Sequence, residues 1–167
     1  IMPPISQAIK TGSIFQSIED GTFCIVLSPP CDLAKHGEKF KTDRILVCEI
    51  EDYDVVNTGI INKATKMKDK RIGIQNAIKN NSTDYYHCLP RNSLFEGGYI
   101  NFRKVITYPP EDFLKKYGQP KVKVQEYFVK NILNRFSAYY ARQGQPDFNF
   151  KLEADAIISN TEVSEII

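Results

Sequence analysis

The stretches TFCIVL, residues 22–27, and RILVCEI, residues 44–50, decide the fold. Both are short, rich in branched apolar residues and bounded by turn-forming residues, which is typical of buried β-strands. The connecting sequence SPPCDLAKHG, residues 28–37, sets a thiol beside a carboxylate after two prolines. Asp32 can cap one helical turn over residues 33–35, and Gly37 can end that turn because glycine tolerates a positive φ.

The remaining pattern mixes strands with a late helix. The residue pattern predicts further strands over 85–90 and 99–108, and one or two helical turns over 111–117. Apolar residues at helical spacing predict a long helix over residues 122–143. Since no strands and helices alternate in βαβ units, we predict an α+β fold with a small, twisted, barrel-like antiparallel sheet and a long C-terminal helix.

Length and composition suit one globular domain. The chain has 167 residues, 42% of them hydrophobic, which is enough for a single core. We expect a single α+β domain over residues 1–150, with a basic helical insertion at 61–80, and an acidic tail over residues 151–167. The start at Ile1 and Met2 suggests either a vector remnant or a piece of a longer protein.

Charge and hydropathy exclude some classes of protein. A net charge of +2 is too small for a bulk polyanion-binding protein. No apolar run reaches the roughly 18 to 20 residues of a membrane-spanning helix, and no export signal is visible. The sequence therefore favours a cytoplasmic protein with reduced cysteines and without a membrane partner.

Four cysteines and two histidines are enough ligands for a tetrahedral zinc. The candidate set is Cys31, His36 and Cys48, with either Cys88 or His87 as the fourth ligand. Adjacent strand residues point to opposite faces, so Cys88 and His87 would not serve together. Because the spacings match no standard zinc signature, a chain without a cofactor is favoured and zinc is the alternative.

Cys31 also fits a catalytic hypothesis. It would be the nucleophile of a hydrolase, with Asp32 as the orienting acid and His87 or His36 as the base. The alternative is structural: Ser28, Cys31 and Asp32 hydrogen-bond the backbone amides of their own turn.

Two basic groups suggest contact with RNA or DNA. Cations with an intervening aromatic ring suit phosphate binding and base stacking, and a solvated basic face is the alternative. The candidate residues are Lys66, Lys68, Lys70 and Arg71 in the insertion, and Arg135, Tyr139 and Arg142 on the late helix.

The motifs VLSPPCDLA, YYHCLP, GGYINF and RFSAYYARQGQPDF resemble a poorly characterised bacterial family. That family has an early Ser/Thr-Pro-x-Cys-Asp-Leu motif and a late Arg-x-Gly-x-Pro-Asp motif, and the likeness spans most of residues 22–148. More distantly, the chain is similar to the PemK/MazF-like toxins, which have an SH3-like barrel and cut or bind single-stranded RNA. The early loop departs from the basic or glycine-rich pattern of those toxins.

The resemblance carries over only to matching positions, and our hypothesis is that the late group of these positions packs near the early loop. Arg142 would then pair with Asp32 or Asp147. The matching positions are Ser28, Cys31, Asp32, His87, Pro90, Arg135, Arg142, Pro146 and Asp147.

Three functions are compatible with the sequence. The first is a binding or effector module, with nucleic acid as its partner, in a defence or toxin-related setting. The second is an enzyme, either a barrel-type ribonuclease or the Cys31 hydrolase. The third is a protein-binding output domain joined to a regulatory domain, which the acidic tail favours.

Overall fold

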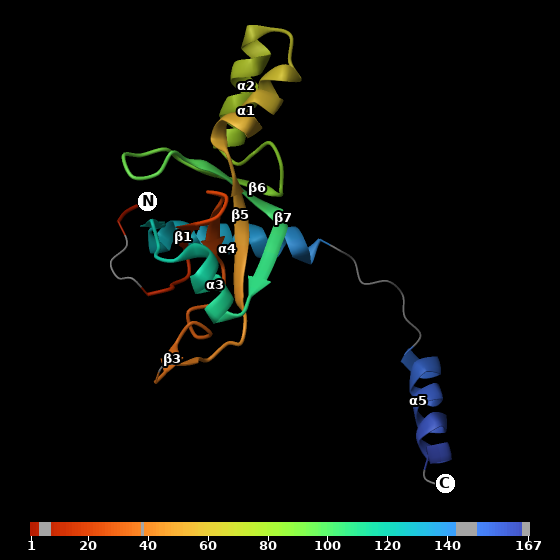
Figure 1. The fold of residues 1–167 in the computed structure, drawn as a ribbon. Coiled ribbons are helices and arrows are strands. Elements are labelled where there is room, and N and C mark those ends of the chain that lie inside the picture. The colour runs from red at the N-terminus through yellow and green to blue at the C-terminus, as the bar shows by residue number, and fades with distance from the viewer. Residues whose placement is uncertain (4–7, 38, 143–149, 165–167) are drawn as a thin grey trace.

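The computed structural model describes residues 1–3, 8–37, 39–142 and 150–164. Six strands form an antiparallel sheet in the order β6-β7-β5-β2-β1-β8 (Figure 1). The strands are β1 (Ser13–Gln16), β2 (Phe23–Val26), β5 (Ile45–Glu51), β6 (Tyr86–Leu89), β7 (Gly98–Tyr108) and β8 (Val122–Lys123). The sheet curls into a half-barrel, so the predicted α+β fold with a twisted, curled sheet is confirmed.

Five helices accompany the sheet in the described part of the chain. They are α1 (Tyr53–Asn62), α2 (Met67–Ile78), α3 (Pro110–Tyr117), α4 (Glu126–Ala141) and α5 (Phe150–Ser164). The strands predicted over 22–27 and 44–50 are neighbours in the sheet, as β2 and β5. The helix predicted over 122–143 is α4, which begins later because Val122 and Lys123 pair with β1.

The predicted helical turn after Asp32 is wrong. The backbone amides of Asp32 and Leu33 both bond to the carbonyl oxygen of Pro29, which closes a turn at that point. The chain then forms a small hairpin of β3 (Lys35–His36) and β4 (Lys39–Phe40).

Alternating side chains give the sheet two faces. One face, which includes Ile100 and Phe102, packs on α4 through Ile132. On the other face, α3 packs on Phe15 near one end of β5 and β7, and the hairpin of α1 and α2 packs on Tyr99 near the other end. Figure 1 shows this hairpin and α3 at opposite ends of the long strands.

The pairing of β5 with β7 contains a shift of register between those two ends. Cys48 pairs with Val105, and Ile50 pairs with Ile100. Residues 101–104 of β7 therefore lie opposite a single residue of β5, Glu49. Such a bulge bends the strand and re-aims the side chains within it. Polar residues of both strands are therefore gathered on the stretch of sheet between α3 and the helical hairpin.

Gly98 begins β7 where the strand passes close to β5. A Cβ atom at this position would lie 2.5 Å from Cγ2 of Ile50 and 2.8 Å from the carbonyl oxygen of Glu51. We expect Gly98→Ala to lower the free energy of unfolding by about 1 to 3 kcal/mol, because the backbone of β5 cannot withdraw. Thermal unfolding followed by circular dichroism measures this change.

Gly59 on α1 provides the matched control. A Cβ atom there meets nothing within 4 Å. Gly59→Ala should leave the melting temperature unchanged or raise it, since alanine favours a helix. Equal melting temperatures for the two variants would contradict the close approach at Gly98.

The described helices include none that is long and apolar enough to cross a membrane. Helix α5 lies away from the sheet in Figure 1. It carries Glu153 and Asp155 within the segment predicted to be an acidic tail.

Candidate functional site

Glu51, at the end of β5, is held by donors from two neighbouring strands. Tyr86 donates its hydroxyl to Oε2 of Glu51 at 2.5 Å, and Asn101 donates Nδ2 to Oε1 at 2.9 Å. Nζ of Lys104 lies 3.0 Å from Oε1 of Glu51 and 2.6 Å from Oε1 of Glu49. We call Glu49, Glu51, Tyr86, Asn101 and Lys104 the Glu51 network.

The protonation states of the network follow from these contacts. Burial disfavours the charged form of Glu51, but hydrogen bonds from Tyr86, Asn101 and Lys104 outweigh it, so the pKa of Glu51 is lowered. Bonds to Glu49 and Glu51 raise the pKa of Lys104. Burial, followed by the bond to Glu51, raises the pKa of Tyr86. At neutral pH, an ionised carboxylate therefore lies beside an ammonium group and a protonated phenol.

Glu51 lines two cavities. One, of about 700 Å³, lies between the α1–α2 hairpin and the rings of Tyr85 and Tyr86. The other, of about 760 Å³, is lined by Thr22 and Lys104 among others. Both volumes are in the range of ligand-binding clefts, so the carboxylate is within reach of a bound molecule from either side.

A second group of side chains lies beside this network. The guanidinium carbon of Arg103 is 3.7 Å from the ring centroid of Tyr85, and that of Arg142 is 5.3 Å from the ring centroid of Tyr139. Arg103 also hydrogen-bonds Tyr139, which raises the pKa of the arginine. We call Tyr85, Arg103, Tyr139 and Arg142 the arginine–tyrosine cluster. Its Tyr85 ring lies 4.6 Å from the ring of Tyr86, which joins it to the Glu51 network.

The three residues predicted on the late helix have different environments. Arg135 donates Nη2 to the carbonyl oxygens of Thr83 and Tyr86 at 3.1 and 3.0 Å, so this half-buried side chain ties the start of β6 to α4. Tyr139 and Arg142 belong to the arginine–tyrosine cluster.

Arg142 forms an ion pair with Asp84, and both side chains are exposed. Its expected pairing with Asp32 is therefore wrong, because the end of α4 lies beside the loop that leads into β6. The alternative partner Asp147 lies outside the described residues, as does Pro146.

The four predicted cations of the insertion lie at the start of α2, at the turn of the helical hairpin. They are Lys66, Lys68, Lys70 and Arg71. The hairpin separates them from the late helix, so the two predicted basic groups do not form one cluster. Lys63 and Asp69, from the same end of the hairpin, line the 700 Å³ cavity together with Tyr85.

The residues of the thiol hypothesis are only partly brought together. Cys31 is exposed, and its thiol donates to Oδ1 of Asp32 at 3.6 Å. Cys31 lies in the loop that follows β2, whereas His87 is on β6. These two strands are three positions apart in the sheet, which corresponds to a separation of roughly 14 Å between the strands. The structure therefore places Asp32, but not His87, beside the thiol.

The predicted zinc ligands do not converge. Cys48 faces α4 and donates its thiol to the carbonyl oxygen of Asn101, whereas Cys88 faces the α1–α2 hairpin on the other side of the sheet. Cys31 and His36 are exposed in the β2–β5 connection. Among the described residues, no three His, Cys, Asp or Glu side chains are grouped to hold a metal ion.

Burial also sets the chemistry of the remaining thiols. It raises the pKa of Cys24 and of Cys48 to about 12, and it raises the pKa of Cys88. These three side chains are therefore protonated, unreactive thiols at neutral pH.

Sequence reasoning missed most of the Glu51 network. Glu49 and Glu51 lie at the end of a predicted strand, where glutamates are typical of solvent-exposed positions and give no signal of a site. Asn101, Arg103 and Lys104 interrupt an imperfect alternation, which was the available signal of a bulge. No sequence pattern joins these positions to Tyr86.

Comparisons with known proteins find likenesses among solved structures. No family model matches the chain, and no curated protein sequence matches it. Among solved structures, the chain is similar to an endoribonuclease in complex with its cognate antitoxin from a mycobacterial species. The two share 11% sequence identity with a TM-score of 0.46, over 84% of this chain and 100% of that chain.

Proposed function

We propose that the protein binds single-stranded RNA along the arginine–tyrosine cluster and the Glu51 network. The observation that carries this proposal is the continuity of the two groups, since the rings of Tyr85 and Tyr86 are 4.6 Å apart. Together they combine aromatic rings, cations and hydrogen-bonding groups on one surface.

Each part of this surface suits an element of a single strand. Unpaired bases stack on aromatic side chains and on guanidinium planes, which Tyr85, Tyr139 and Arg103 supply. The ion pair of Arg142 with Asp84 is exposed to solvent and therefore contributes little free energy. A phosphate group can take the place of the Asp84 carboxylate for that reason. Lys63, at the end of α1, lines the 700 Å³ cavity and offers a further phosphate contact.

Arg103→Ala tests the binding surface. We expect it to weaken binding of a fluorescein-labelled oligoribonucleotide about tenfold, because both the stack on Tyr85 and one phosphate contact are lost. The salt dependence should also flatten, by about 0.7 in the slope of log affinity against log salt for each phosphate contact removed. Fluorescence anisotropy between roughly 50 and 200 mM salt measures both quantities.

Lys115→Ala is the matched control, because Lys115 is an exposed cation on α3, which lies at the opposite end of the long strands from the helical hairpin. It should leave affinity and salt slope unchanged. Binding that is indifferent to salt, or equal affinities of the two variants, would contradict the proposed surface.

The Glu51 network favours a second candidate function, RNA cleavage. An ionised carboxylate can take the proton of a ribose 2′ hydroxyl, whose oxygen then attacks the adjacent phosphorus. The bond to the 5′ oxygen breaks, leaving a 2′,3′-cyclic phosphate and a 5′ hydroxyl that takes its proton from water. Lys104 would stabilise the negative charge that develops on the phosphate oxygens.

A further inference from the structure

His87 is a buried titratable residue that the proposed RNA surface does not use. It alternates along β6 with Tyr86 and Cys88, which face the helical hairpin, and so its own side chain faces α4. The side chain is 94% buried, since its relative exposure is 6%, and Nδ1 has no hydrogen-bond partner in the described structure. Buried polar atoms nearly always have a partner, so this atom points to a ligand.

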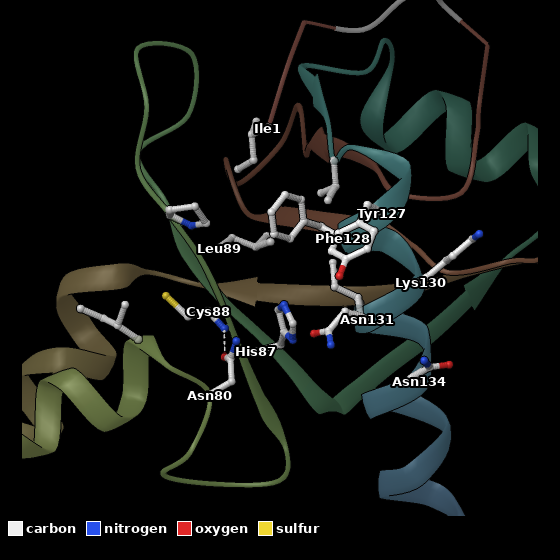
Figure 2. A pocket seen from close by; sticks show the side chains of 14 residues that line it. Ile1, Asn80, His87, Cys88, Leu89, Tyr127, Phe128, Lys130, Asn131 and Asn134 are labelled. Atoms are coloured by element: carbon white, nitrogen blue, oxygen red, sulfur yellow. Dashed lines mark hydrogen bonds between the residues drawn. The ribbon is translucent and has the colours of Figure 1, made fainter.

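His87 lines a cavity of about 610 Å³ between β6 and α4. Figure 2 shows His87 and Asn131 together in this cavity, with Phe128 and Leu89 on its apolar side. Asn131 and Asn134 are three residues apart and lie on one face of α4. The volume is sufficient for a nucleotide-sized molecule.

The polar groups of the cavity are neutral donors and acceptors. Burial, and then the charge of Arg135, lower the pKa of His87 to about 4, so the imidazole is uncharged at neutral pH. An uncharged imidazole and a carboxamide each offer one donating and one accepting side. None of the lining residues is a carboxylate, and Lys130 is the cation among them.

Neutral donor–acceptor pairs beside an aromatic ring are the chemistry that recognises a nucleobase. Phe128 is 54% exposed, so its ring is available for stacking. Lys130 suits a phosphate group attached to the same nucleotide. A carboxylic acid would instead require an arginine or a second cation in the lining, and a metal ion would require further ligands near His87.

We propose that this cavity binds a nucleobase, stacked on Phe128 with its edge against His87 and Asn131. The cavity is lined by no residue of the Glu51 network or of the arginine–tyrosine cluster, so the proposal stands without the proposed RNA function. The base belongs either to a free nucleotide or to an RNA strand that also contacts the arginine–tyrosine cluster. Both sources share the same recognition chemistry.

The side-chain nitrogen resonances of the two histidines give a direct test in ¹⁵N-labelled protein. AMP, CMP, GMP and UMP are added separately, with ribose 5-phosphate as the base-free control. We expect at least one nucleotide to shift the Nδ1 resonance of His87, while exposed His36 stays unchanged and ribose 5-phosphate has no effect. An oligoribonucleotide that shifts His87 when mononucleotides do not identifies the RNA strand as the source of the base.

Variants test the assignment of individual contacts. Phe128→Ala and Asn131→Ala should each weaken the binding that shifts His87 by about tenfold, whereas His36→Gln should leave it unchanged. Thermal unfolding checks that each variant is folded.

The proposal is overturned if neither nucleotides nor RNA shift His87, or if Asn131→Ala binds as the parent does. The first result leaves the RNA surface intact if Arg103→Ala still weakens RNA binding. Conversely, a shift of His87 by nucleotides without any binding of RNA supports the cavity and rejects the surface.

Discussion

Under the proposed cleavage function, Glu51→Gln is expected to lower the rate of RNA cleavage about 10²- to 10⁴-fold relative to the parent protein. The carboxamide cannot take the proton of the ribose hydroxyl. RNA affinity should stay close to that of the parent, because the arginine–tyrosine cluster is unchanged. Cleavage of an end-labelled RNA on gels measures the rate, and anisotropy measures the affinity with the same RNA.

Glu49→Gln separates a proton acceptor from a general effect of charge. Glu49 also contacts Lys104, at 2.6 Å, but receives no bond from Tyr86 or Asn101 in the described network. This variant should retain most of the cleavage activity. Equal losses in both variants, or full cleavage by Glu51→Gln, would contradict the assigned role of Glu51.

The pH dependence has a defined sign. Because the pKa of Glu51 is lowered, the carboxylate stays ionised below the pH at which an ordinary glutamate takes up a proton. Cleavage should therefore persist into mildly acidic solution and fall only as the pH drops through the lowered pKa. The stability that the network contributes is present above the pKa of Glu51 in the unfolded chain and is lost over the same acidic range.

The sequence predicted those elements whose signal lies within one segment. Strands β2 and β5 and helix α4 each have a continuous apolar pattern, which burial on the sheet requires. Strand β8 has two residues and is defined by its pairing with β1 and by a bridge from Lys123 to Met2. Helix α1 also escaped prediction, since Val55, Val56, Asn57 and Thr58 are poor helix formers and its start depends on the cap at Asp52.

The candidate site was harder to predict because it depends on register. Residues 101–104 face Glu49 through a shift that no local pattern specifies, and this shift brings Lys104 to two carboxylates. The predicted residues Tyr139 and Arg142 do belong to a surface cluster, but their partners are Tyr85, which precedes β6, and Arg103 of β7. Arg135 is a cation of the kind that binds phosphate, but its Nη2 atom already donates hydrogen bonds to the carbonyl oxygens of Thr83 and Tyr86.

The core and this surface meet at Phe102. Its ring is fully buried and packs against Phe136 and Tyr139 of α4, with centroids 5.7 and 6.3 Å apart. Its carbonyl oxygen accepts a hydrogen bond from Tyr140 at 2.8 Å. The same residue therefore fixes the bulge of β7 and the helix that carries half of the arginine–tyrosine cluster.

Phe102→Ala is consequently expected to lower the free energy of unfolding by about 3 to 5 kcal/mol, the usual cost of removing a buried phenyl ring. Urea unfolding followed by circular dichroism measures this loss. Ile106→Ala is the matched control, because Ile106 lies on the same strand but is 40% exposed and should cost much less. At temperatures where Phe102→Ala remains folded, RNA affinity should also fall, because Tyr139 loses the phenyl ring against which it packs. Unchanged affinity would mean that α4 holds the arginine–tyrosine cluster in place without help from β7.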